Sequence, residues 1–428
     1  MTQQNDIDEF FSTDRVAGRD EAIELPSGGY REYLIDRADP MLADYRGMSY
    51  EEFTADRYQA EFLQELLAYW RGLYEEPFVG VTSDGAVREG VYALPDPPPA
   101  ADPAPAAAAE HLLALLDEER RERVSYPIDA PEWRGWSNPE FVFFRNGLRL
   151  EDESEEVVRA ILAVVEASLS PEGYARAAEA MELNGFLGEL VDLPTIMNPR
   201  SYWFSIFGDP AAAASGAPWG WQLFGHHLAL NFASAAGREI IAPAFIGAEP
   251  ALSDGARPPL FDARERLAIE LGESLDPAQR ERAIVYRSVL DPAMPEGRLH
   301  PADERHVAGA FRDNRVVPYE GICAAELDAR QRALLRAIAE DFFLLLGPAQ
   351  RELTMADFDR CIDETWFSWY GATDGTQPFY FRIQSPVILA ELDHHAGVWL
   401  GNRLPARFHV HTTLRMPNGA DYAKAFIG

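Results

Sequence analysis

Hydrophobic positions near the start of the chain recur at the spacing of a helix. Within residues 49–74, large apolar side chains at positions 53, 58, 62, 66, 67 and 70 return at helical intervals. This pattern predicts a helix that buries one face.

Four later segments share a pattern that is typical of helix starts. In each of them a leucine precedes an Asp or Ser side chain, which can accept hydrogen bonds from the free backbone N–H groups of a first turn. A following proline is already in the conformation of that turn. The four segments are Leu116-Asp117, Leu169-Ser170-Pro171, Leu275-Asp276-Pro277 and Leu327-Asp328.

Runs of strand character follow between and after these helices. Residues 221–232 and 239–245 flank Ala236-Gly237-Arg238, which predicts a β-hairpin. Residues 364–370, 379–393 and 408–416 form three more runs, and residues 77–94 predict short strands around a turn. We therefore expect an α+β fold, in which a mainly antiparallel β-sheet core carries packed helices on one side.

A proline- and alanine-rich run divides the chain at residues 95–110, and its composition is typical of an extended connector. This predicts an N-terminal segment of helix and short strands in residues 1–94. The α+β catalytic core then spans residues 111–428, and residues 50–94 join it as one integrated domain.

Composition restricts the partners and the compartment. The chain has 428 residues with 38 Lys and Arg against 70 Asp and Glu, a formal net charge of −32. Such an acidic protein repels phosphate backbones and anionic lipids, so we expect no nucleic-acid or membrane partner. Two cysteines without a Cys-x-x-Cys pair, and a start without the basic and apolar regions of a secretion signal, predict a cytoplasmic protein. The sequence leaves the oligomeric state open.

Histidines supply the candidate chemistry. Six of the nine form three tight groups: His226-His227, His394-His395 and His409-Val-His411. Neutral imidazole binds transition metals, and histidine also moves protons near neutral pH. On a strand, His409 and His411 would project from the same face, as a metal pair requires. The alternative is a polar sheet face whose histidines bind only water and neighbouring groups.

A carboxylate could complete this site. An antiparallel return of residues 379–395 would bring Glu391, Asp393, His394 and His395 near the histidine pair, giving two imidazoles and one carboxylate. Glu391 is the preferred ligand because it follows an apolar stretch, where an unpaired charge is costly. Glu391 and Asp393 are also candidate catalytic groups. The alternative for Glu391 is a salt bridge with an arginine.

The remaining candidates lie on other strands. His226 and His227 occur in the middle of an apolar run, so on a strand they would face opposite sides, yet both are candidate metal ligands. Arg382 and Gln384 are predicted to bind a substrate carboxylate, since guanidinium groups pair with such groups. Arg415 is predicted to share this role and to act in catalysis.

Taken in order, these motifs resemble a known family. Gly225-His226-His227-Leu-x-Leu-Asn231, residues 243–250 and 380–384, Glu391-Leu-Asp393, His409-Val-His411 and residues 415–422 are similar to the signature of the bacterial domain of unknown function 3500 family. The resemblance covers about residues 50–428. It implies that Gly225, His226, His227, Glu391, His409 and His411 lie on family motif positions.

Three functions fit such a site. The first is an oxidoreductase that uses iron or copper to activate dioxygen and oxidise a small organic substrate. The second is a zinc- or manganese-dependent hydrolase, in which Glu391 or Asp393 is the base. The third is a non-enzymatic metal-binding protein. The absence of a His-Glu-x-x-His motif favours oxidation over hydrolysis, and therefore iron or copper over zinc or manganese.

Overall fold

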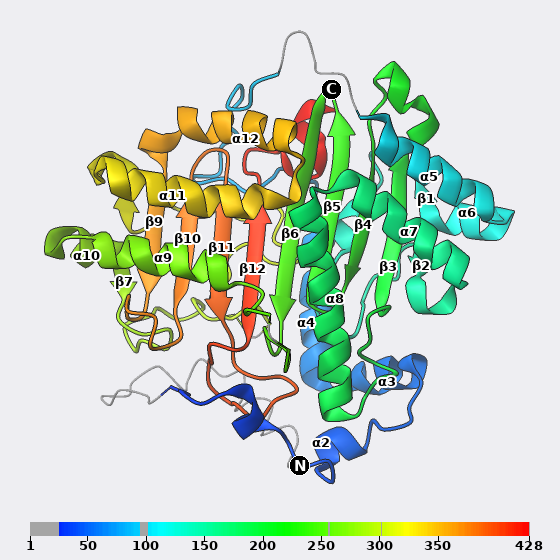
Figure 1. Cartoon of the computed structure of the whole chain (residues 1–428), viewed down its shortest axis with the longest axis horizontal. Helices are drawn as coiled ribbons and strands as arrows, with labels where there is room; N and C mark the ends of the chain where they lie inside the picture. The colour runs from blue at the N-terminus through cyan, green and yellow to red at the C-terminus, as the bar shows by residue number, and fades with distance from the viewer. Residues whose placement is uncertain (1–24, 95–101, 256, 301, 428) are drawn as a thin grey trace.

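A central twelve-stranded sheet organises the protein (Figure 1). The computed structural model describes residues 25–94, 102–255, 257–300 and 302–427. The strand order is β1-β3-β4-β5-β6-β12-β11-β10-β9-β7, with β2 paired to β3 and β8 paired to β9. The strands are β1 (Ser125–Tyr126), β2 (Leu148–Arg149), β3 (Tyr202–Gly208), β4 (Trp219–Gly225), β5 (Leu228–Ala235), β6 (Arg238–Ala248), β7 (Ile284–Tyr286), β8 (Ile322–Cys323), β9 (Trp366–Tyr370), β10 (Tyr380–Gln384), β11 (Leu389–His394) and β12 (Val410–Arg415).

The predicted α+β class is confirmed, although the sheet is mixed. Most neighbours pair antiparallel, whereas β1 with β3 and β7 with β9 pair parallel. The Ala236-Gly237 hairpin is confirmed by the pairing of Ala235 with Arg238. Residues 379–393 form two strands, β10 and β11, because residues 385–388 make a tight turn between them.

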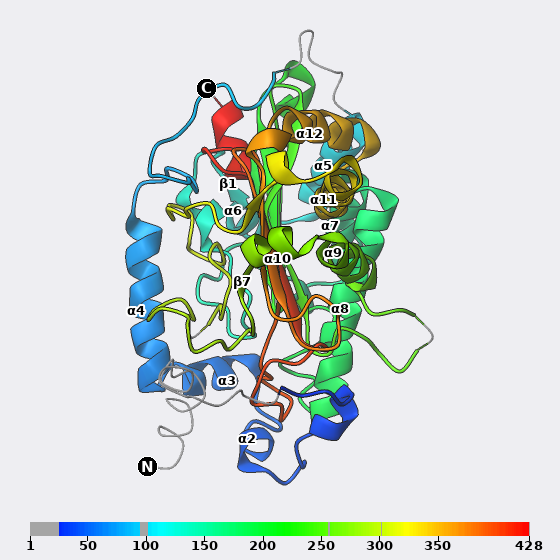
Figure 2. The same ribbon diagram turned by 90° about the vertical axis from the view of Figure 1, so that its left-hand side faces the viewer.

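Helices cover both faces of the sheet (Figure 2). Helices α8 (Pro171–Val191), α9 (Asp262–Ser274) and α11 (Ala329–Phe342) lie on one face and α4 (Glu61–Glu75) lies on the other, so the expectation of helices on one side was wrong. A non-helical stretch, residues 302–321, lies on the same side of the sheet as α4, and we call it the covering segment. The helices are α2 (Pro40–Ala43), α3 (Tyr50–Arg57), α4 (Glu61–Glu75), α5 (Pro103–Leu115), α6 (Glu118–Val124), α7 (Glu155–Ser168), α8 (Pro171–Val191), α9 (Asp262–Ser274), α10 (Pro277–Ala283), α11 (Ala329–Phe342) and α12 (Pro348–Arg360).

All four predicted helix starts are confirmed. Asp117, Ser170, Asp276 and Asp328 are the N-caps of α6, α8, α10 and α11, and each side chain accepts a backbone N–H of the first turn. The single helix predicted over residues 49–74 is instead two helices, α3 and α4. The chain turns at residues 58–60, where the Tyr58 hydroxyl donates to the Val142 carbonyl.

Two other segments differ from their sequence-based interpretation. Residues 95–101 of the proposed connector lie outside the described residues, but residues 103–110 belong to α5. Asp102 caps this helix, Pro103 opens its first turn, and alanine has the highest helix propensity. Residues 77–94 were expected to form short strands, but their described pairing is one bridge between Thr82 and Val316.

Among the described helices, none has both the length and the apolar character that a membrane-spanning helix requires.

Replacing Asp328 by Ala should lower the free energy of unfolding by about 1 kcal/mol, because α11 loses its cap. Asp328 accepts the Gln331 N–H at 2.9 Å, and the Gln331 side chain accepts the Asp328 N–H in return. Urea unfolding measures the change, with Asp328→Asn as the control that keeps an accepting oxygen. Equal stability of the Ala variant and the parent would contradict the assignment.

Candidate metal centre

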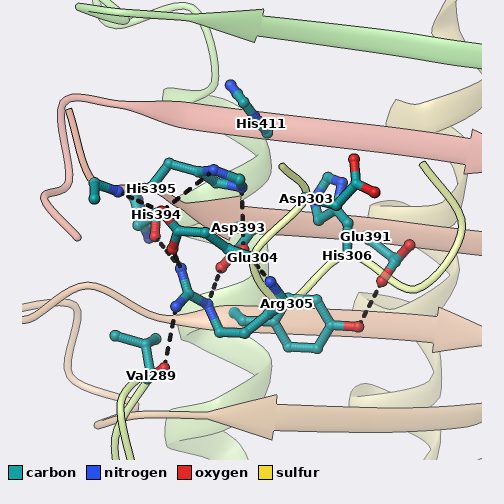
Figure 3. Close-up of polar contacts among 12 residues, drawn as sticks. Val289, Asp303, Glu304, Arg305, His306, Glu391, Asp393, His394, His395 and His411 are labelled. Carbon is teal, nitrogen blue, oxygen red and sulfur yellow. Dashed lines mark hydrogen bonds and ion pairs between the residues drawn. The ribbon is translucent and has the colours of Figure 1, made fainter. Parts of the chain in front are cut away.

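The candidate site residues of β11 and β12 lie on the sheet face that the covering segment covers, apart from His394. Strands β11 and β12 pair so that Glu391 is opposite Thr413 and Asp393 is opposite His411. Because side chains alternate along a strand, these four residues project from the same face. The next residue along β11, His394, projects from the other face toward α9 (Figure 3).

Three imidazoles converge at the end of β12. One nitrogen from each of His227, His409 and His411 lies within 4.8 Å of the others, and all three residues are buried. The Nε2 atoms of His409 and His411 are 3.0 Å apart. Two nitrogens that each bind the same ion at about 2.0–2.1 Å lie roughly 3 Å from each other. The geometry therefore suits a shared metal ion.

A backbone carbonyl fixes the tautomer of His409. Its Nδ1 lies 2.7 Å from the Ala396 oxygen. A carbonyl oxygen only accepts, so Nδ1 carries the proton and Nε2 presents its lone pair toward His411. Such an outer contact orients a metal-binding imidazole.

A tight turn, not a strand, places His227. Strand β4 ends at Gly225 and β5 begins at Leu228, so the expected continuous strand over residues 221–232 was wrong. His227 adopts φ 61°, and its carbonyl accepts the Gly247 N–H at 2.7 Å. The turn makes the rings of His226 and His227 stack at 3.9 Å instead of facing opposite sides.

His226 supports the cluster from behind His227. The Asn184 amide donates to the Asn198 carbonyl, which leaves its Oδ1 to accept from His226 Nδ1 at 2.8 Å. Burial lowers the pKa of His226 to about 3, so its ring is neutral. The structure brings His226 beside the three converging imidazoles through this ring stack.

A second group of potential ligands adjoins the first. It consists of His306, Asp393 and His395, whose ligand atoms also lie within 4.8 Å of one another. His395 Nε2 lies 3.1 Å from an Asp393 oxygen, and the rings of His395 and His411 are 3.8 Å apart. His306 was not predicted from the sequence, because it is a single histidine in a segment without regular structure and no spacing marks it.

Burial and neighbouring charges set the protonation states. Burial holds the pKa of His227, His409 and His411 well below the usual range of histidine, so all three are neutral. Burial also acts to lower the pKa of His395, but the carboxylates of Glu304 and Asp393 outweigh it and raise the value. The centre therefore combines three neutral imidazoles, which can bind a cation, with two neighbouring carboxylates, Glu304 and Asp393.

Arg305 secures Asp393 (Figure 3). Its guanidinium donates from Nε to Asp393 at 2.6 Å and also to the His394 and Val289 carbonyls. Despite burial, this contact keeps the pKa of Asp393 below its usual range. Asp393 is thus an anion inside the protein, held by the covering segment.

Three predicted ligands lie outside both groups in the described structure: His226, which stacks on His227, Glu391 and His394. Glu391 accepts the backbone N–H groups of Val307 and Ala308 at 2.9 and 3.1 Å and the Tyr380 hydroxyl at 2.7 Å. It therefore anchors the covering segment. His394 Nδ1 contacts the Phe379 carbonyl at 2.8 Å on the opposite face of the sheet. The predicted ligand roles of Glu391 and His394 gain no support from these positions.

The three predicted substrate-binding residues also contact the covering segment or residues close to it. Arg415 pairs with Asp313 at 2.7 Å and Asp421 at 3.1 Å. Arg382 lies 3.7 Å from Glu320, and Gln384 donates to the Val317 carbonyl. These contacts hold the segment on the sheet, and the substrate and catalytic roles of Arg382, Gln384 and Arg415 stay predictions.

Comparison with known proteins identifies the family. Residues 101–424 match the family described as protein of unknown function (DUF3500), so the chain belongs to this family and the resemblance seen in the sequence is confirmed. No curated protein and no solved structure matches the chain. The family description supplies no activity, so a function has to be argued from the site.

Replacing Gly247 by Ala should weaken metal binding about 10- to 100-fold, the range expected when a metal ligand loses its support. A Cβ at this position would lie 2.8 Å from His411 Cδ2 and 3.1 Å from His227 Cδ2, so both rings must move. Titration of chelator-treated protein with Co²⁺ measures the affinity.

Gly72→Ala is the matched control for this experiment, because nothing lies within 4 Å of a Cβ placed there. A folded Gly247→Ala variant with the affinity of the parent would contradict the placement of the two rings.

Proposed function

We propose that this member of the family is a metal-dependent oxidoreductase that uses dioxygen to oxidise a small organic substrate. His227, His409 and His411 would hold the metal, which we expect to be iron or copper. The observation that carries the proposal is the convergence of three buried, neutral imidazoles within 4.8 Å.

The ligand types favour a redox metal. Imidazole suits iron, copper and zinc, whereas magnesium and calcium prefer sites built from oxygen ligands. Three protein ligands leave coordination positions open for dioxygen or substrate, as in catalytic metal sites. An all-imidazole set favours copper, and the nearby Asp393 carboxylate favours iron if it joins the set.

Hydrolysis is the second candidate, and the state of Asp393 supports it. Three imidazoles also suit zinc, which lowers the pKa of bound water. Asp393 is kept ionised by Arg305 beside the centre, where it could accept a proton from that water. Zinc or manganese would be the cofactor of this alternative. A metal-binding protein without catalysis is the third candidate.

The partner and the location are part of the proposal. We expect a small-molecule substrate and neither nucleic acid nor membrane as partner, because the net charge is −32. A cytoplasmic location agrees with the two free thiols, Cys323 and Cys361.

Elemental analysis of protein purified without a chelator or a metal-binding tag tests the proposal. We expect bound iron or copper in the parent, and a large loss of that metal in His409→Ala and His411→Ala, because each variant removes one of three ligands. Circular dichroism should show that both variants keep the fold. Zinc alone would favour hydrolysis over oxidation.

His394→Gln is the matched control, since His394 is a buried histidine of the same sheet that faces away from the centre. It should keep the parent's metal content. Unchanged metal content in the His409 and His411 variants, or an absence of metal in the parent after supply of iron, copper and zinc, would overturn the proposal.

A further inference from the structure

We infer that the centre holds two cations, with the second one bound by His306, Asp393 and His395. This inference rests on the proposed metal function of the same site and extends it from one ion to two. The two ligand groups share no residue, and each has its own ligand atoms within 4.8 Å.

A buried nitrogen without a hydrogen-bond partner supports a cation at the second position. Within the described residues, Nε2 of His306 is buried and has no hydrogen-bond partner. His395 Nε2 is close to Asp393 but also lacks hydrogen-bond geometry with any described group. A buried polar atom without a partner destabilises the folded protein. A cation at this position would give His306 Nε2 a partner and would take the place of a proton between His395 Nε2 and Asp393.

His306 is held in place by its other nitrogen. Its Nδ1 lies 2.8 Å from the Thr413 hydroxyl on β12. The next two residues, Val307 and Ala308, donate their backbone N–H groups to Glu391. Glu391 therefore acts as a positioning residue for the loop that carries His306, which gives a physical reason for a buried carboxylate next to the centre.

Charge also favours a cation here. Asp393 is the buried anion of the group, and its Oδ1 already binds Arg305 Nε at 2.6 Å. Its Oδ2 contacts the Arg305 backbone N–H at 3.2 Å and faces His395 Nε2. A monodentate bond from this second oxygen to a metal would leave the Arg305 contact intact.

The two positions differ in the metals they suit. Two imidazoles and one carboxylate with open positions are typical of non-haem Fe²⁺, whereas three imidazoles suit copper or zinc. His395 and His411, one from each group, lie with their rings 3.8 Å apart. Ions at both positions would therefore be neighbours, and two adjacent ions can bind one small molecule between them.

Metal stoichiometry tests the inference. The full chain is treated with chelator, titrated with Co²⁺ by calorimetry, desalted and analysed for cobalt. We expect two Co²⁺ per chain in the parent and one in His306→Gln and Asp393→Asn, since each variant removes a ligand of the second position and leaves the three imidazoles of the first in place. His409→Ala should keep the ion at the second position.

Glu391→Asp is the positioning control. It keeps a carboxylate for the covering segment and should retain two Co²⁺ per chain, with weaker binding of the second. Asp393→Asn can fail to fold, because Arg305 would lose its partner. In that case the cobalt content of His306→Gln decides between one ion and two, since this substitution leaves no buried charge unpaired.

The outcomes separate this inference from the proposed function. A parent that binds one Co²⁺, and a His306→Gln variant that keeps it with the same affinity, would overturn the second position and leave the first intact. Loss of all cobalt in His306→Gln would also overturn it, because a single ion would then use both groups. A parent that binds no cobalt would overturn the proposed function itself.

Discussion

The antiparallel register of β11 and β12 is the constraint on which the centre depends. It sets Asp393 directly opposite His411 and Glu391 directly opposite Thr413. A shift by one residue would turn these side chains to the α9 face, because side chains alternate along a strand. Pairing of β12 with β6 then places Gly247 opposite His411, where the absence of a side chain leaves room for the rings.

The covering segment converts this sheet face into a closed, polar interior. Buried carboxylates of the sheet hold it: Glu391 binds two of its backbone N–H groups, and Asp393 binds Arg305. Arg415 from β12 binds Asp313 of the segment in return. Each of these buried charges has a partner, which offsets the cost of removing it from water. The same contacts hold His306 next to the centre.

Burial gives the imidazoles their chemical character. An exposed histidine is partly protonated near neutral pH, and a protonated ring cannot bind a metal. Inside the sheet, loss of hydration keeps His227, His409 and His411 neutral. The closed environment also strengthens electrostatic interactions with any bound ion. Neutral imidazoles in a buried site can bind the metal that we propose.

Local sequence determined the helix starts, most of the strand runs and the placement of His409 and His411 side by side. Capping and alternation act over a few residues, so Asp276, Ser170 and the His-x-His motif could be interpreted without the fold. Tertiary structure decided the rest. Which carboxylate lies beside histidines depends on sheet register and on the covering segment, and these place Asp393 with His306 and His395 while Glu391 binds the covering segment. His306 comes from a segment without periodicity, and His227 depends on a two-residue turn, so only the packed chain brings them to the centre.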